Sequence, residues 1–182
     1  IRLYLNDQLV AERPTTRKEE FKAFIALPYQ PGTLRCVGIN EDGTEGETVT
    51  LSTAGEVQNI VLTPDRTVLQ SDGQDLCYVT VELTDAEGRR CPNAENELTF
   101  SLKGAGEIIA VDNALLKDTT PYTSLTRKAW KGRAMVVIKT HKNGGKITLR
   151  ATSPGLKDAS VTVKSMKILP DTPKEGERYV KG

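Results

Sequence analysis

Few residues of this 182-residue chain carry side chains that could do chemistry, and they are scattered. Asp72, Asp75 and Asp85 offer carboxylate oxygens, the ligands that a hard cation such as calcium prefers. However, DGQD at 72–75 lacks the ligand count of a calcium loop, and Asp beside Gly is typical of a turn. His141, the single histidine, has no companion histidine or nucleophile and is interpreted as a polar residue at a strand end. We therefore expect no metal site, no cofactor and no catalytic residue.

The three cysteines, Cys36, Cys77 and Cys91, include no CxxC pair. This argues against a zinc ribbon, a thioredoxin-type site and a dense disulfide scaffold. Cys77 and Cys91 flank an expected turn at 85–88, but a hairpin centred there would pair Cys77 with a residue nearer Asn96. A disulfide would therefore need a shifted register. We favour three buried free thiols.

Three aromatic residues could contact a ligand. Trp130, the only tryptophan, stands in RKAWKG, and a solvent-facing indole could stack on a sugar ring. We favour packing of Trp130 between two sheets, because a bulky strand residue often takes that place in a β-sandwich. Tyr29 in PYQPG and Tyr122 in TPYTS are expected on loops, where they would cap the edge of a domain.

The elements that must position these side chains are short runs of alternating apolar and polar residues, which predict β-strands. The runs are residues 1–5, 21–27, 34–39, 47–51, 76–83, 98–102, 134–138, 147–151 and 159–168. Turn signals such as Asp42-Gly43 and Asn143-Gly144 separate them. No segment of ten residues has a helical stripe, although residues 16–24 could form one turn. The chain is predicted to be all-β.

The order of elements over residues 58–102 (strand, polar loop, long strand, turn, strand) is typical of an immunoglobulin-like β-sandwich. The length of the chain suits two such domains. We predict a partial immunoglobulin-like domain over 1–54, a C-terminal immunoglobulin-like sandwich over 55–169 and a flexible tail over 170–182. The first domain has too few strands for a full sandwich, and the chain begins without Met inside an expected strand. We expect the first domain to be truncated and the chain to be cut from a longer polypeptide.

The charge balance argues against two classes of partner. With 25 basic and 24 acidic residues the net charge is +1, and Lys and Arg are not concentrated as binding to nucleic acid or an anionic membrane requires. No run of about 18 apolar residues is present, so we expect no membrane insertion.

Two sets of motifs, which together cover nearly the whole chain to about residue 168, resemble a known family. The first set is LYLN at 3–6, PYQPGTL at 28–34 and the DG turn at 42–43. The second set is Asp65-Arg66, DGQDL at 72–76, VTV at 79–81, DAEG at 85–88, PNA at 92–94, VDN at 111–113, Arg127, WKGRA at 130–134 and SPGL at 153–156. They resemble the two C-terminal domains of glycoside hydrolase family 2 proteins, the β-galactosidase-like enzymes of Bacteroides and relatives. Ala114 departs from the family, in which Gly usually follows the Asn.

The resemblance implies an accessory role. In family 2 both catalytic glutamates lie on a barrel of about 250 residues, and no segment here could form it. The fragment is therefore expected to be inactive, its parent to be a β-galactosidase-like glycosidase, and its partners to be the upstream catalytic domains of the same polypeptide. A glycan and a second copy of the chain are further partners left open. The loop over 111–123 resembles one that lies toward the barrel in some relatives. Candidate contacts to substrate or catalytic domain are Asp112, Asn113, Tyr122 and Trp130.

Two other functions stay open. A carbohydrate-binding module needs an exposed aromatic platform, and the chain has one Trp, five Tyr and three Phe, several of which must fill cores. An immunoglobulin-like segment of a bacterial surface adhesin is the other, although no convincing internal repeat is present. The resemblance also implies export to the periplasm or the cell surface of a bacterium.

Overall fold

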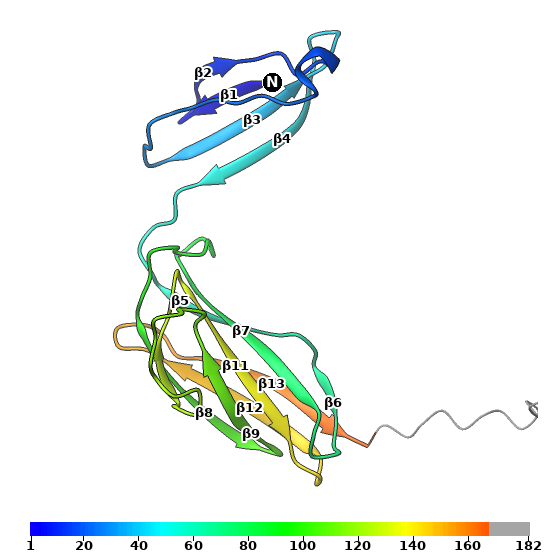
Figure 1. Cartoon of the computed structure of the whole chain (residues 1–182), viewed down its shortest axis with the longest axis vertical. Coiled ribbons are helices and arrows are strands. Elements are labelled where there is room, and N and C mark those ends of the chain that lie inside the picture. Colours follow the sequence, from blue (N-terminus) through cyan, green and yellow to red (C-terminus); the bar gives the residue numbers. More distant parts are fainter. Residues whose placement is uncertain (168–182) are drawn as a thin grey trace, which may run out of the picture. The chain divides into compact units, whose positions relative to one another are not determined.

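The computed structural model describes residues 1–167, which divide into two compact units. Unit 1 is Ile1–Thr53, and unit 2 begins at Ala54. Both are built from β-strands, so the prediction of an all-β chain is confirmed (Figure 1). The flexible tail predicted over 170–182 lies outside the described residues. Within residues 1–167, no helix has the length and apolar character needed to cross a membrane.

Unit 1 is one antiparallel sheet with the strand order β2-β1-β3-β4. Its elements are β1 (Arg2–Leu5), β2 (Gln8–Glu12), the 3-10 helix η1 (Arg17–Glu19), β3 (Thr33–Ile39) and β4 (Glu45–Ser52). The strand predicted over 21–27 is wrong. Asn6 and Asp7 have positive φ and form a two-residue turn, so residues 8–12 take the place beside β1. Glu20 and Phe21 also have positive φ, which interrupts an extended backbone.

The side chain of Asn6 connects the two motifs of unit 1, LYLN and PYQPGTL. Its Oδ1 accepts the Thr33 N–H at 2.9 Å, and its Nδ2 donates to the Pro31 carbonyl at 3.2 Å. Any Cβ at Gly32 would overlap Asn6. The side chain of Asn6 fills the space that a side chain at residue 32 would occupy. This explains why the asparagine and the glycine occur together.

One face of the unit 1 sheet is apolar, because residues directly opposite each other in an antiparallel pair point to the same side. We call this set of six residues the open face: Leu3, Leu5, Leu34, Cys36, Val49 and Leu51. Unit 1 is described throughout, and only Leu3 and Val37 of its apolar residues are buried. Val49 and Leu51 are 65% and 67% exposed. Unit 1 is therefore a half-covered sheet rather than a sandwich with a closed core.

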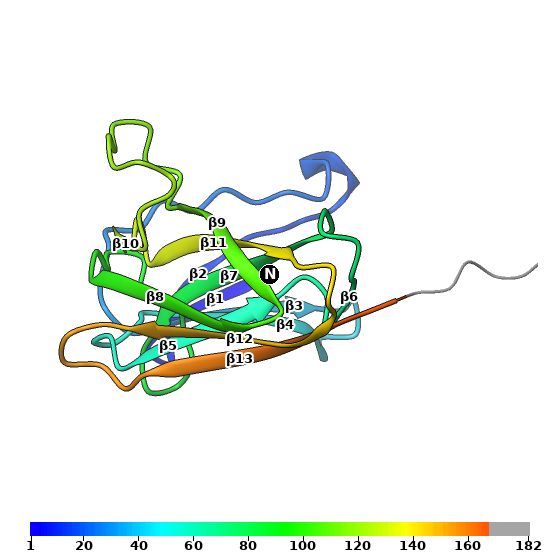
Figure 2. The same ribbon diagram turned by 90° about the horizontal axis from the view of Figure 1, so that it is seen from below.

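Unit 2 is a sandwich of two sheets (Figures 1 and 2). The first has the order β5-β7-β11-β9, with β5 at Asn59–Pro64, β7 at Leu76–Thr84, β11 at Arg133–Thr140 and β9 at Gly106–Asp112. The second has the order β10-β8-β12-β13-β6, with β10 at Thr126–Lys128, β8 at Glu97–Gly104, β12 at Gly145–Thr152, β13 at Ala159–Met166 and β6 at Val68–Gln70. Pairing is antiparallel except between β13 and β6. Figure 2 shows the β9–β10 loop extending away from the strands.

The core of unit 2 lies between these sheets and is formed by every second residue of their strands. The residues of β7 that point inward are fully buried, among them Val79, Val81 and Leu83. Phe100 and Leu149 face them from the second sheet. Each fully buried side chain of this kind contributes about 1.5–3 kcal/mol relative to exposure. Unit 2 has many such residues, whereas unit 1 has one, Val37.

The cysteines are free thiols, as predicted, although Cys36 is half-buried rather than buried. β7 and β8 lie in different sheets and do not form a hairpin with each other; Cys77 is in register with Ile138 of β11. Burial, together with the neighbouring Asp65 carboxylate, raises the pKa of Cys77 to about 11.

A two-residue turn joins β10 to β11. Trp130 and Arg133 exchange backbone hydrogen bonds of 2.8 and 3.0 Å, and both residues between them, Lys131 and Gly132, have positive φ. Gly132 also donates to the Ala94 carbonyl at 2.9 Å. This turn fixes the place of Trp130 at the edge of the sandwich.

Gly132→Ala is expected to destabilise unit 2 more than Gly88→Ala, although both glycines have positive φ. Each substitution costs about 1–2 kcal/mol in backbone strain. A Cβ at Gly132 would also lie 2.3 Å from the Cys91 carbonyl oxygen, whereas nothing lies within 4 Å of one at Gly88. Relieving that overlap costs a further ~1–3 kcal/mol. Urea unfolding of both variants measures the difference, and equal losses of stability would contradict the steric argument.

Candidate functional site

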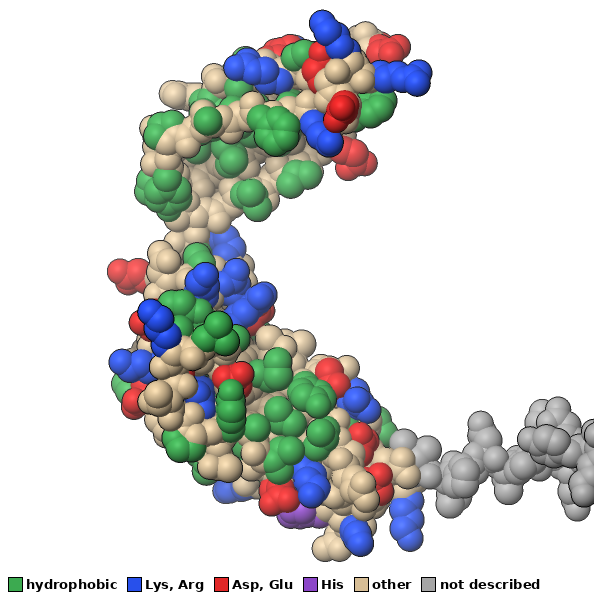
Figure 3. Space-filling model, viewed as in Figure 1, with side chains coloured by type: hydrophobic (Ala, Val, Ile, Leu, Met, Phe, Trp, Pro, Cys, Tyr) green, Lys and Arg blue, Asp and Glu red, His purple; other side chains and the backbone are tan. Residues whose placement is uncertain are grey.

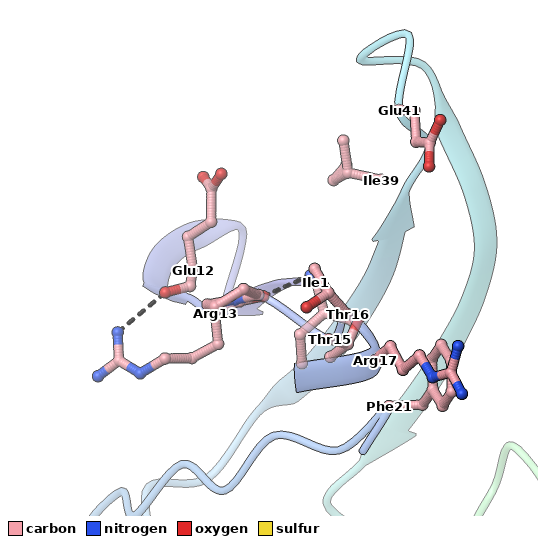
Figure 4. Close-up of a pocket in the computed structure, with 10 residues that line it drawn as sticks. Ile1, Glu12, Arg13, Thr15, Thr16, Arg17, Phe21, Ile39 and Glu41 are labelled. Carbon is pink, nitrogen blue, oxygen red and sulfur yellow. Dashed lines mark hydrogen bonds between the residues drawn. The ribbon is translucent and has the colours of Figure 1, made fainter. Parts of the chain in front are cut away.

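A hollow of about 720 Å³ in unit 1 contains two carboxylates, from Glu12 and Glu41 (Figure 4). A retaining glycosidase needs two carboxyl groups about 5–5.5 Å apart that face one bond. Figure 4 shows the two side chains on different sides of the hollow, pointing away from each other. Glu12 is also paired with Arg2 at 3.0 Å. The hollow does not have the geometry of a glycosidase centre.

The β10 groove of unit 2 is the hollow that contains predicted site residues. It measures about 540 Å³ and is lined by the β9–β10 loop, β10 and the residues on either side of them. We define it by its lining residues, Glu95, Glu97, Asn113, Leu115, Lys117, Asp118, Thr119, Thr120, Ser124, Thr126, Arg127, Lys128, Ala129 and Trp130. Asn113 and Trp130 were predicted; Asp112 and Tyr122 lie outside the lining.

Arg127, which is 3% exposed, holds the β9–β10 loop in place. Its guanidinium donates to Asp118 Oδ2 at 2.8 Å and to the carbonyls of Thr120 and Pro121 at 2.8 and 3.0 Å. A buried charge must be paired in this way to be tolerated. The hydrogen bonds from Thr120, with the nearby Arg127 charge, hold the pKa of Asp118 at about 2. The loop is thus fastened to β10 by one ionised pair.

Asn113 also holds the β9–β10 loop in place. Its Nδ2 donates to Asp118 Oδ2 and to the Lys128 carbonyl, both at 2.9 Å, and its Oδ1 accepts the Leu115 N–H at 2.9 Å. All of these bonds are internal, so Asn113 positions the loop rather than presenting a free amide to a ligand. Asp112 accepts the N–H groups of Asn113 and Ala114 and likewise supports the start of the loop.

The two aromatic candidates differ from expectation. Trp130 is not in the core between the sheets, contrary to the favoured interpretation: it is half-buried and lines the groove. It stands directly before the Lys131-Gly132 turn, and Phe100 takes a central place in the core instead. Tyr122 is 63% exposed, with the Arg127 guanidinium 5.6 Å from its ring centroid. Tyr29 of unit 1 is 80% exposed and therefore does not cap an edge by burial.

The charged rim of the groove is balanced. Glu95 and Glu97 contribute two exposed carboxylates, and Lys117 and Lys128 contribute two exposed ammonium groups. Glu97 and Lys128 face each other directly across the β8–β10 pair. Because Arg127 and Asp118 neutralise one another, the groove has hydrogen-bonding groups of both signs and little net charge.

The three aspartates considered as calcium ligands serve as acceptors for backbone N–H groups. Asp72 Oδ1 accepts two such bonds in its own turn, and Asp75 Oδ2 accepts the Gln70 N–H. Burial alone would raise the pKa of Asp85, but hydrogen bonds from Gly55 and Arg89 lower it to about 2. Residues 1–167 contain no group of three His, Cys, Asp or Glu placed to hold a metal. His141 lies exposed directly after β11.

Hydrophobic side chains also gather on the outer side of unit 2, over β7, β11 and β9 (Figure 3). Tyr78 and Met135 are each 42% exposed there, and Val137 lies between Tyr78 and Ala110 in register. A patch of a few residues is normal on a protein surface and does not by itself identify a binding site.

The family model for glycoside hydrolase family 2 C-terminal domain 5 matches residues 60–162, which cover most of unit 2. The chain belongs to this family. The match confirms the resemblance found in the motifs, and a family 2 C-terminal domain is a non-catalytic part of the enzymes that carry it.

The relatives that are named for an activity are glycosidases. The chain is 38% identical over 142 residues to β-galactosidase BoGH2A of Bacteroides ovatus, a match that covers 78% of this chain and 17% of that protein. It is 30% identical over 172 residues to a β-glucuronidase of Formosa agariphila, covering 92% and 17%. A solved family 2 glycosyl hydrolase of Bacteroides cellulosilyticus is 34% identical and superposes with a TM-score of 0.83 over 91% of this chain and 21% of that one. The chain thus spans about a fifth or less of the length of these relatives.

Sequence reasoning found Asn113 and Trp130 but not the residues that organise the groove. Arg127 matched a family motif, yet its neighbours Thr126 and Lys128 are polar too, so alternation gave no sign that it points inward. Nothing in the sequence marks Asp118, since KDTT at 117–120 looks like an ordinary polar loop. A lone arginine on a short strand beside a long polar loop was the one available signal.

Ala114→Gly is expected to stabilise unit 2. Ala114 has φ 61°, the left-handed conformation that the family's usual glycine adopts without strain. Relief of about 1–2 kcal/mol of strain outweighs roughly 0.4–1 kcal/mol of added chain entropy, for a net gain of about 0.5–1 kcal/mol. The control is Ala86→Gly, an exposed turn position without positive φ, which should lose stability. Thermal unfolding that ranks the two variants the other way would refute this account of the loop.

The β9–β10 loop is expected to loosen in acid. The lowered pKa of Asp118 means that its contribution to stability is complete above the ordinary carboxyl value of 3.8 and is lost as pH falls toward about 2. The Thr120 amide donates to Asp118 Oδ1 at 2.8 Å, so its NMR shift should titrate with a midpoint near 2. In Asp118→Asn that titration should vanish. A midpoint near 4 in the unmodified chain would show that the hydrogen bonds from Thr120 and the ion pair with Arg127 do not stabilise the carboxylate.

Proposed function

We propose that this chain is the non-catalytic C-terminal support of a β-galactosidase-like family 2 hydrolase, and that unit 1 packs through its open face against other segments of the same polypeptide. The observation that carries the proposal is the open face itself. Six apolar residues share one side of a single sheet, and the two on β4 are about two-thirds exposed.

Energetic considerations favour a covering partner. A unit of about 50 residues is at the lower limit of independent stability even with a complete core. Unit 1 has two buried apolar side chains, Leu3 and Val37. Covering Val49 and Leu51 would contribute about 1.5–3 kcal/mol for each side chain. Family membership and the greater length of the relatives support a partner within the same polypeptide.

The activity of the parent is inferred from the relatives. Two of them are named as a β-galactosidase and a β-glucuronidase, so hydrolysis of a β-glycosidic bond is the shared chemistry. We assign a galactoside because the match of higher identity is the β-galactosidase. Export to the periplasm or cell surface and self-association of the chain follow from the resemblance alone and stay predictions.

The isolated chain is expected to release no nitrophenol from aryl β-galactosides or aryl β-glucuronides, while the complete polypeptide hydrolyses one of them. The physical reason is that the two catalytic glutamates of the family lie on a barrel, whereas the described residues form β-sheets with one short 3-10 helix, and that the two carboxylates of the unit 1 hollow point apart. Turnover by the isolated chain that a single carboxylate substitution within it abolishes would overturn the accessory role.

The open face is tested by comparing the same variant in two polypeptides. Val49→Thr with Leu51→Thr should change the stability of the isolated chain little, since both side chains already meet water. In the complete polypeptide the pair should lower the unfolding temperature of this region, with a cost of roughly 2 kcal/mol or more if both sites are buried. Thr48→Ser with Thr50→Ser, on the other side of β4, is the matched control. Equal effects in both polypeptides would show that the open face has no partner.

A further inference from the structure

The β10 groove combines features that neither the support role nor the core of unit 2 requires. Trp130 is the one tryptophan of the chain, and the turn after β10 brings it out of the core to line a hollow of about 540 Å³. Small-ligand sites occupy about 300–1,000 Å³ and join an apolar surface to a few fixed polar groups. Trp130 supplies the apolar surface, and Glu97 and Lys128 are polar groups beside it.

We propose that the β10 groove binds a neutral pyranose sugar, with the indole of Trp130 against the sugar ring and with Glu97 and Lys128 hydrogen-bonded to its hydroxyl groups. A sugar ring has apolar C–H faces that suit an aromatic surface and a rim of hydroxyls that both donate and accept. Carboxylates accept from hydroxyls, and ammonium groups donate to them. The groove contains both kinds of group next to its aromatic residue.

The charges in the groove favour a neutral sugar over an acidic one. Glu95 and Glu97 are balanced by Lys117 and Lys128, and the Arg127 guanidinium is already paired with Asp118 at 2.8 Å. A uronate or a phosphate would therefore meet two carboxylates as well as two ammonium groups, and it would find no arginine free to bind it. Arginine is the residue that suits such anions best, because it binds them in two places.

The groove is organised before any ligand arrives, which keeps the entropic cost of binding low. Arg127 and Asn113 fasten the β9–β10 loop through Asp118 and backbone carbonyls. The Lys131-Gly132 turn follows Trp130 directly, and the Lys131 ammonium lies over one face of the indole, 5.8 Å from the ring centre, so the sugar would take the other face. Pairing of β10 with β8 fixes Glu97 opposite Lys128. The proposal does not depend on how the open face of unit 1 is covered.

The tryptophan gives a direct measurement, because all tryptophan fluorescence of the chain comes from Trp130. Galactose, glucose and lactose are titrated into the chain to about 100 mM, a range suited to a shallow site with a millimolar dissociation constant. At least one sugar should change the emission in a saturable way, and the amide NMR signals of Thr126, Lys128 and Trp130 should move with the same constant. Galactitol, which has the hydroxyls of galactose without a ring, should have no effect. Glucuronate should bind more weakly than the neutral sugars.

Glu97→Gln and Lys128→Gln test the polar contacts without removing the reporter. Each is exposed, so folding should be retained, and each should weaken binding about fivefold or more. Glu107→Gln and Lys103→Gln are exposed controls outside the groove and should bind as the unmodified chain does. The proposal is overturned if no sugar gives a saturable change, if galactitol acts equally, or if the groove variants bind like the controls. Tighter binding of glucuronate would overturn the assignment to a neutral sugar.

Discussion

The structure of unit 2 depends on one constraint: every second residue of its long strands must leave water. The inward side chains of β7, β8, β11 and β12 form one core between the two sheets. Arg127 occupies an inward position on β10, where a charge cannot remain unpaired. The buried guanidinium donates to Asp118 and to the carbonyls of Thr120 and Pro121. The shape of the β9–β10 loop therefore follows from the burial of one guanidinium.

Unit 1 meets the same constraint only in part. Its strands alternate as clearly as those of unit 2, yet β4 has no residue that is buried. The difference lies in what covers each sheet rather than in the strands themselves. A second sheet closes the core of unit 2, whereas the open face of unit 1 has no such layer among residues 1–53. A surface of this kind suits attachment to a larger body.

Alternation was enough to predict most of the long strands and the all-β class, since it reflects burial directly. It failed at 21–27, where Glu20 and Phe21 turn into a left-handed conformation that alternation cannot reveal. It also missed short strands such as β6 and β10, which have three residues each and are held by neighbours far along the chain. Trp130 was predicted in the core because bulky residues usually lie there. It lies instead beside the Lys131-Gly132 turn, whose glycine packs against the Cys91 carbonyl and donates to the Ala94 carbonyl, contacts that the sequence does not reveal. Asn113 was found through a motif, but only the positions of Asp118 and Lys128 in the structure show that it holds the β9–β10 loop in place.

The thiols of unit 2 have a consequence for where such a domain can fold. Cys77 and Cys91 are buried in different surroundings, and the pKa of each is raised by loss of contact with water, so little thiolate forms at neutral pH. Thiolate is the form that reacts with oxidants and disulfides. Once folded, unit 2 should be indifferent to the redox potential around it, and it would need neither a disulfide-forming catalyst nor a reducing buffer to persist.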